Sequence, residues 1–385
     1  MGDNALMRGL RPAAVPAARV ARAVRTAVPT RALASAPGPH MPVERIAFGD
    51  RPDAPVAVGL GDPPGQRWLA AVVLGARGRY AAAAELLEGV CRERRASTAV
   101  RAHAAVTRAA HLRQLGGHAE ARRWDGIGLA LATRTPGDRT QPASAAHRSD
   151  AVCAVSEVRA VGGEHEVAAS LGLDLAAARA DALIGLAADA IGLADPTLAE
   201  GLLRRAERAV REHPSWRPTV RWYWVRAELA LSTGRPGQAR SAARRAVEAA
   251  KAVGAVRHEL KSALVHSVAD ASAGRPTDEL AVELTALAER ARRVRLSTLE
   301  WPARLVLADL IGGVDLARSG GCRRRAVHVL ACIRRRADPQ GRRILDSSPW
   351  VPDISESLLL HSDACHPPET CRSAHSSRME CKNRP

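Results

Sequence analysis

Apolar and polar residues alternate with a helical period along most of the chain, from Arg67 to about Arg336. Ala and Leu recur every three or four positions, with Arg, Glu or Asp between them, in stretches of roughly 12–18 residues separated by short turns. This spacing predicts amphipathic helices. Pro, Gly, Ala and Arg dominate the chain before this region, and Ser, His, Cys and Pro dominate after it. We therefore predict three segments: a disordered arm over residues 1–65, a helical domain over 66–345 and a disordered tail over 346–385.

The helical domain repeats itself at a period near 40 residues. An alanine recurs early in every second helix, and a glycine turn precedes most of these helices, as in Gly78-Arg79-Tyr80 before Ala83. The recurring alanines stand at positions 83, 121, 199, 239, 281 and 326, with spacings of 38, 78, 40, 42 and 45 residues. Because 78 is close to twice the period, we expect a degenerate unit between residues 140 and 175.

Small residues at fixed positions suit a stacked repeat. A single pair of helices cannot bury both of its apolar faces, so neighbouring pairs must stack, and small residues let the helices touch. The pattern resembles the tetratricopeptide repeat family in two places: Trp68, Ala71, Gly78-x-Tyr80-x-x-Ala83, and Trp224, Ala227, Gly234, Ala239 with Ala246. The resemblance covers about residues 66–340. The period exceeds the family's usual length of about 34 residues, which implies longer helices or loops and leaves a more general α-solenoid open.

The resemblance implies an all-α fold, a right-handed superhelical array of six or seven antiparallel helix pairs. In this family the first helix of each pair lines a concave groove that binds a peptide or a partner protein. The groove positions carried over to this chain are His103, Arg113 and Gln114 in the second unit, Arg221, Trp224 and Glu228 in the fourth, and Lys261 in the fifth. Lys261 belongs to the set if its unit is counted from Gly274, but not if it is counted from Ala281.

The positive charge of the chain indicates what kind of partner the groove would bind. The chain has 57 Lys and Arg against 40 Asp and Glu, a formal net charge of +17. Three of the predicted groove residues, Arg113, Arg221 and Lys261, are cationic, so the groove is expected to favour an acidic segment or a C-terminal carboxylate. A basic surface also attracts nucleic acid, but no zinc finger, recognition helix or RNA-binding motif accompanies the arginines.

The amino-terminal arm accounts for part of the positive charge. Residues 1–42 hold six arginines and one acidic residue. We interpret this stretch as a disordered arm. A mitochondrial presequence and translation from Met41 are the alternatives.

Aromatic residues gather at Arg221-Trp222-Tyr223-Trp224-Val225-Arg226. Arginines interleaved with aromatic rings can stack on bases or hold an acidic peptide. In the repeat register, however, Tyr223 and Trp224 begin the first helix of a unit, where large residues pack against the preceding unit. We favour packing, and both uses can hold together.

The sequence lacks the motifs of common catalytic and metal sites. There is no Gly-x-Ser-x-Gly elbow and no phosphate-binding loop, and neither His165-Glu166 nor His258-Glu259 has a second histidine one turn later. The spacing of Cys365, Cys371, His375 and Cys381 matches no common zinc finger. We expect no enzymatic activity, no cofactor and no metal site.

Cysteine number and hydropathy indicate the compartment. The seven cysteines are odd in number and suggest free thiols in a reducing environment. No window offers the roughly 18 consecutive apolar residues of a membrane span. The sequence therefore predicts a cytoplasmic interaction scaffold without a membrane partner. The alternatives are a sensor arm acting with a transcriptional regulator, and direct nucleic-acid binding through the arginines.

Overall fold

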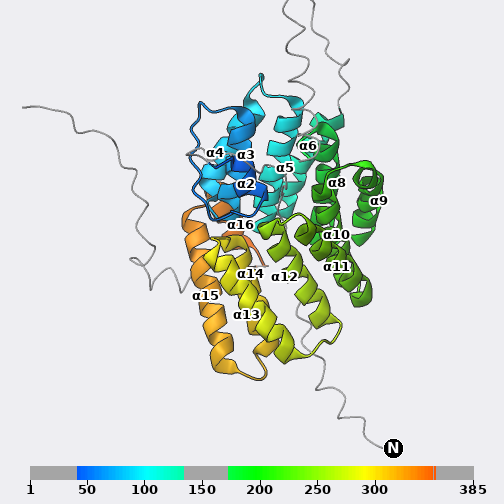
Figure 1. Cartoon of the computed structure of the whole chain (residues 1–385), viewed down its shortest axis with the longest axis vertical. Coiled ribbons are helices and arrows are strands. Elements are labelled where there is room, and N and C mark those ends of the chain that lie inside the picture. Colours follow the sequence, from blue (N-terminus) through cyan, green and yellow to red (C-terminus); the bar gives the residue numbers. More distant parts are fainter. Residues whose placement is uncertain (1–40, 134–171, 350, 353–385) are drawn as a thin grey trace, which may run out of the picture.

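The computed structural model describes residues 41–133, 172–349 and 351–352, and every regular element in those residues is an α-helix (Figure 1). The prediction of an all-α protein is confirmed for this part of the chain. The helices are α2 (Val43–Phe48), α3 (Pro64–Ala76), α4 (Tyr80–Arg92), α5 (Thr98–Gln114), α6 (His118–Thr133), α8 (Leu175–Gly192), α9 (Pro196–Glu212), α10 (Trp216–Ser232), α11 (Pro236–Ala252), α12 (Val256–Ser272), α13 (Thr277–Arg293), α14 (Ser297–Ile311), α15 (Leu316–Arg335) and α16 (Pro339–Ser347).

Twelve of these helices pack in consecutive pairs: α3 with α4, α5 with α6, α8 with α9, α10 with α11, α12 with α13 and α14 with α15. Glycine makes four of the turns inside the pairs, as the sequence predicts. Gly78, Gly116, Gly234 and Gly274 have φ angles of 72°, 95°, 71° and 82°, which glycine adopts without the steric cost that a Cβ brings. In the third pair Ala194 takes this conformation, with φ of 62°.

The recurring small residue lies at the fourth position of the second helix in a pair. Ala83, Ala121, Ala199 and Ala239 occupy this position in α4, α6, α9 and α11, and all four are fully buried. In α13 and α15 the equivalent residues are Leu280 and Ser319, not the predicted Ala281 and Ala326. With this correction the repeat spacings become 38, 78, 40, 41 and 39 residues, which is more regular than the alanines suggest.

The degenerate unit expected between residues 140 and 175 falls mostly on residues 134–171, which lie outside the described residues. Within the described part, α8 packs directly against both α5 and α6. The second and third pairs are therefore neighbours in space.

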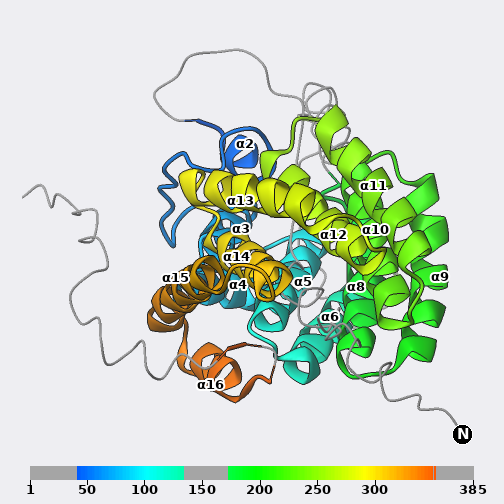
Figure 2. The same cartoon turned by 90° about the horizontal axis from the view of Figure 1, so that it is seen from below.

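The row of pairs closes on itself. Each first helix contacts the next, from α3 through α5, α8, α10 and α12 to α14, and α14 in turn contacts α3. At the closure, Thr298 Oγ1 donates a hydrogen bond to the Ala76 carbonyl at 2.9 Å, and the Ala81 amide donates to the Arg336 carbonyl at 2.8 Å. Figure 2 shows the first helices around a common centre, with α9 and α11 at one outer edge and α15 at the other.

Two short helices, α2 and α16, pack against the closed ring. In α2 the Phe48 ring is buried and lies 5.9 Å from the Trp68 ring, so the predicted disordered arm does not extend through residues 41–65. Asp338 caps the start of helix α16: its carboxylate accepts the Gly341 amide and also pairs with Arg108 of α5 at 3.0 Å. Its contacts tie the end of the described chain to the second pair. No helix in the described residues is long and apolar enough to cross a membrane.

Candidate functional site

All seven residues predicted to line a groove are buried. Each of them exposes between 0% and 7% of its surface: His103, Arg113, Gln114, Arg221, Trp224, Glu228 and Lys261. They do lie on the first helices of their pairs, α5, α10 and α12, as the resemblance implies. Because the first helices surround a common axis, this face is covered by neighbouring helices in the described part of the chain.

Arg113 joins three helices in the interior. Its guanidinium donates to Asp189 of α8, with Nε 2.6 Å from Oδ1, and also to Asp125 of α6. His118 lies 3.2 Å from the same Asp189 carboxylate. Burial alone would raise the pKa of Asp189, but the Arg113 charge and the hydrogen bond from His118 hold it below its ordinary value. The pKa of Asp125 is raised, because burial outweighs its pairing with Arg113.

Arg221 belongs to a second buried cluster, which Asp181 of α8 organises. Asp181 accepts a hydrogen bond from Arg217, and its other oxygen lies 2.7 Å from Arg221 Nη1. Burial opposes ionisation of this carboxyl, but the two guanidiniums keep its pKa below the ordinary value. His103 also lies within 3.9 Å of Asp181 and stacks on the Trp68 ring at 4.9 Å. Burial lowers the pKa of His103 to about 3, so the ring is neutral at pH 7.

The remaining predicted residues fill the interior beside these clusters. Lys261 Nζ lies 4.1 Å from the Trp224 ring centre, and the indole Nε1 of Trp224 donates to Ser262 at 2.8 Å. Gln114 accepts a hydrogen bond from the Tyr80 hydroxyl. Glu228 is fully buried on the same face of α10 as Trp224. These contacts assign the predicted groove residues to the packing of the ring.

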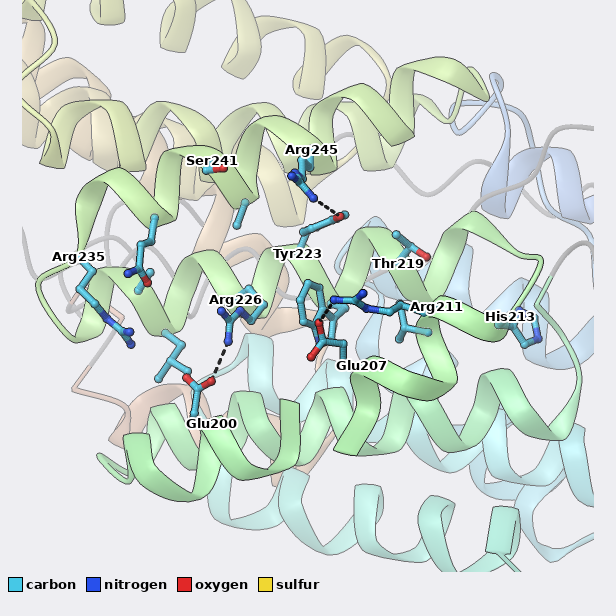
Figure 3. A pocket seen from close by; sticks show the side chains of 16 residues that line it. Glu200, Glu207, Arg211, His213, Thr219, Tyr223, Arg226, Arg235, Ser241 and Arg245 are labelled. Carbon is cyan, nitrogen blue, oxygen red and sulfur yellow. Dashed lines mark hydrogen bonds and ion pairs between the residues drawn. The ribbon is translucent and has the colours of Figure 1, made fainter. Parts of the chain in front are cut away.

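An open groove lies on the outside of the ring, between α9, α10 and α11 (Figure 3). Its volume is about 680 Å³. We call it the outer groove. It is lined by Glu200, Glu207, Val210, Arg211, His213, Thr219, Trp222, Tyr223, Arg226, Leu229, Ala230, Arg235, Gln238, Ser241, Ala242 and Arg245.

Helix α10 contributes one face to the interior and another to the outer groove. Arg217, Arg221, Trp224 and Glu228 recur at helical spacing on the buried face. Residues at positions between these line the outer groove. The main ones are Trp222, Tyr223 and Arg226, which are half-buried. The helical period thus divides the aromatic cluster at residues 221–226 between packing and an accessible surface.

Arginines outnumber carboxylates in the outer groove. Arg226 pairs with Glu200 at 2.8 Å and lies 5.4 Å from the Trp222 ring centre, and Arg211 pairs with Glu207. Two further arginines have no carboxylate within 4.0 Å among the described residues. Arg235 Nε donates to the Thr233 hydroxyl at 3.0 Å, and Arg245 donates to the Tyr223 hydroxyl at 3.3 Å.

Sequence reasoning found part of this groove and missed the rest. The cluster at residues 221–226 drew attention to α10, although its accessible members were not separated from its buried ones. Arg245 belongs to the second helix of the pair and Arg235 is the residue just before that helix, where the family resemblance places no binding residue. A helical projection of α10 is the signal that could have separated the two faces.

Comparisons with known proteins found no match: no family model, no curated protein and no solved structure matches this chain. Within the described residues no group of three or more His, Cys, Asp and Glu side chains could hold a metal ion. The described cysteines, Cys91, Cys322 and Cys332, are free thiols, and burial raises the pKa of Cys91 to about 11. The Cys and His residues predicted to lie in the tail fall outside the described residues.

Proposed function

We propose that this protein is an interaction scaffold that binds an acidic, extended segment of a partner protein in the outer groove. The observation that carries the proposal is the pair Arg235 and Arg245, which line the groove beside the half-buried rings of Trp222 and Tyr223 and have no carboxylate within 4.0 Å in the part of the chain that the structure describes. Carboxylates of a partner would supply the missing anions in charge-assisted hydrogen bonds, and the rings would cover its apolar side chains.

The dimensions of the groove suit a short peptide. Its floor runs along α10 from Thr219 to Ala230, a length of about 16 Å at the helical rise of about 1.5 Å per residue. An extended chain advances about 3.3 Å per residue, so about five residues would fill the floor. Helices α9 and α11 form the two walls, as Figure 3 shows.

Acidic peptide is favoured over single-stranded nucleic acid by the carboxylates of the groove. Glu200 and Glu207 stand on the α9 side and would repel a continuous phosphate backbone. Their pairing with Arg226 and Arg211 leaves net positive charge mainly on the α11 side. A peptide can place its acidic residues toward α11 and uncharged residues toward α9.

We further propose that the paired helices form a right-handed array of antiparallel hairpins of tetratricopeptide type. The small fourth residue in five of the six second helices and the glycine turns support this interpretation, as does the repeat spacing of 38 to 41 residues in adjacent pairs. A repeat architecture supports a role in binding, because its stacked pairs display extended surfaces. The closed inner face moves the proposed contact surface to the outside of the ring.

The proposal is tested by selecting a phage-displayed library of random decapeptides on the full-length chain. Each selected phage is then tested against R235E/R245E and against R94E/R95E. Arg94 and Arg95 are exposed in the turn after α4 and do not line the outer groove, so this control makes the same charge change elsewhere. We expect enrichment of sequences with two or more Asp or Glu, bound by the control and not by R235E/R245E.

Two outcomes would overturn the proposal. One is selection of no sequence above background, and the other is selection of sequences that R235E/R245E binds as well as the parent chain does. Binding of fluorescent oligo-dT to the parent, lost in R235E/R245E and in 0.5 M salt, would assign the groove to nucleic acid instead.

A further inference from the structure

Two arginines of the outer groove are held at fixed places beside its floor. Arg245 Nη1 donates to the Tyr223 hydroxyl at 3.3 Å, and its guanidinium carbon lies 5.9 Å from the centre of the Tyr223 ring. Arg235 Nε donates to the Thr233 hydroxyl at 3.0 Å, and that hydroxyl in turn donates to the Leu229 carbonyl at 2.7 Å. A guanidinium carries five N–H donors, so each keeps further donors for a ligand.

Two other arginines of α11 take no part in the groove. Arg240 Nε lies 2.7 Å from a carboxylate oxygen of Asp270 on α12, and Arg244 Nε lies 3.8 Å from a carboxylate oxygen of Glu248. Neither Arg240 nor Arg244 belongs to the lining. In the described part of the chain, the α11 side of the groove therefore presents guanidiniums at two separate points.

These two points lie about 15 Å apart along the groove, because Arg245 comes ten positions after Arg235 and an α-helix rises about 1.5 Å per residue. Figure 3 shows Ser241 between the two arginines. In an extended peptide, side chains two, four or six positions apart project on the same side, at distances of about 7, 13 or 20 Å. A separation of four positions matches the two arginines best.

The α9 side of the groove favours residues of another kind. In an extended peptide the residues next to each acid project to the opposite side, so they would face α9. Glu200 and Glu207 line that side, and they pair with Arg226 and Arg211 respectively. A further carboxylate there would be repelled by the two glutamates. We therefore expect uncharged residues beside each acid.

We infer that the outer groove selects segments in which two acidic residues stand four positions apart, with uncharged residues between them. The two carboxylates bind Arg235 and Arg245 in charge-assisted hydrogen bonds. The residue midway between them lies against the uncharged side chains of Gln238, Ser241 and Ala242 on α11. This inference rests on the proposed function and adds the spacing that a partner must have.

Designed peptides of nine residues test the spacing. Each contains two Glu in a background of Ser, Ala and one Leu, with the glutamates two, three, four, five or six positions apart, so that all five peptides have the same charge. Fluorescence anisotropy of the labelled peptides is measured with the full-length chain. We expect the separation of four to bind most tightly. The other separations should bind about tenfold more weakly, because one arginine then lacks its carboxylate.

Exchange of charge assigns each glutamate to its arginine. R245E should bind the best peptide about tenfold more tightly when one of its glutamates is replaced by lysine, and R235E should do so when the other glutamate is replaced. R244E is the matched control, because Arg244 is the exposed neighbour of Arg245 outside the groove. This control should bind the unaltered peptide within about threefold of the parent chain.

Equal binding at every separation would overturn the inference, and the proposed function would still stand if R235E/R245E abolished that binding. A lysine exchange that restores binding to neither variant, or the same exchange restoring it to both, would contradict the spacing. Failure of all five peptides to bind would also overturn the inference, and the phage selection would then decide on the proposed function separately.

Discussion

The carboxylate of Asp125 on α6 lies where a side chain on Gly185 of α8 would begin. A Cβ at residue 185 would overlap the carboxyl group of Asp125, which is completely buried and is held by Arg113. The same relationship recurs twice, between Gly192 and His118 and between Gly75 and His111. Glycines on the first helices thus make room for buried polar side chains of a neighbouring helix.

Gly185→Ala tests this relationship. The added methyl group must displace Asp125 from its pair with Arg113, and overpacking of this kind costs about 1–3 kcal/mol in the free energy of unfolding. Gly201→Ala is the matched control, because Gly201 also lies inside a helix and a Cβ there has its nearest neighbour at 3.9 Å. We expect the control to gain up to about 1 kcal/mol from helix propensity in urea denaturation. Equal effects of the two substitutions would contradict the packing described for Asp125.

Asp181→Asn tests the shared carboxylate. Removing its charge leaves Arg217 and Arg221 buried beside each other, and loss of one partner from a buried ion pair costs about 3–5 kcal/mol. Asp309→Asn removes a carboxylate that pairs with Arg323, whose side chain is half exposed, so a change of about 0–1 kcal/mol is expected. Urea midpoints of the two variants give the comparison, and a loss below 1 kcal/mol for Asp181→Asn would show that the cluster is solvated.

His258→Phe tests the buried neutral histidines. His258 lies against Trp216 and Trp224, neither ring nitrogen has a hydrogen-bond partner among the described atoms, and burial lowers its pKa well below 6.5. Below pH 6.5 the unfolded chain therefore binds a proton at this residue that the folded chain does not, so folding stability falls as the pH falls.

The phenylalanine variant binds no proton at this residue in either state. Between pH 6.5 and 5 its free energy of unfolding should depend on pH less steeply than that of the parent, by a difference that grows to about 1.4 kcal/mol per pH unit toward pH 5. The remaining slope comes in part from His103 and His111, whose pKa values are also lowered. Denaturant titrations at three pH values measure both slopes. Identical slopes would show that His258 is protonated in the folded chain.

Thr298→Val tests closure of the ring. The Thr298 hydroxyl joins α14 to α3 through the Ala76 carbonyl, and its loss leaves that buried site unsatisfied at a cost of about 1–3 kcal/mol. Thr133→Val is the control, because its exposed hydroxyl bonds only to carbonyls of its own helix. The control should change stability by less than about 0.5 kcal/mol. A negligible effect of Thr298→Val would indicate that the first and last pairs do not meet in solution.

The sequence predicted the helices and their pairing because both depend on local signals. Apolar residues recur at helical spacing, and glycines such as Gly78 and Gly234 occupy turns that require a positive φ. The register of the last two pairs was wrong because Leu280 and Ser319 replace the alanine that marks the other pairs. A position defined by packing accepts several small or apolar residues, so residue identity alone cannot locate it.

The site was harder to predict because accessibility depends on closure of the ring. The resemblance selects the inner face of α10 for Arg221 and Trp224, but contacts between α14 and α3 are made by residues more than 200 positions apart and leave that face buried. An arginine in the sequence does not by itself reveal whether its side chain is buried or exposed. Only the three-dimensional arrangement distinguishes Arg221 from Arg235.

The central claim is that the outer groove binds an acidic peptide through Arg235 and Arg245. Fluorescence anisotropy of a selected, labelled peptide, titrated with the parent, R235E/R245E and R94E/R95E, tests it most directly. Losing two charge-assisted contacts of about 1.5–3 kcal/mol each should weaken binding at least 100-fold in R235E/R245E and leave the control within about threefold of the parent. Equal dissociation constants for the parent and R235E/R245E would contradict the claim.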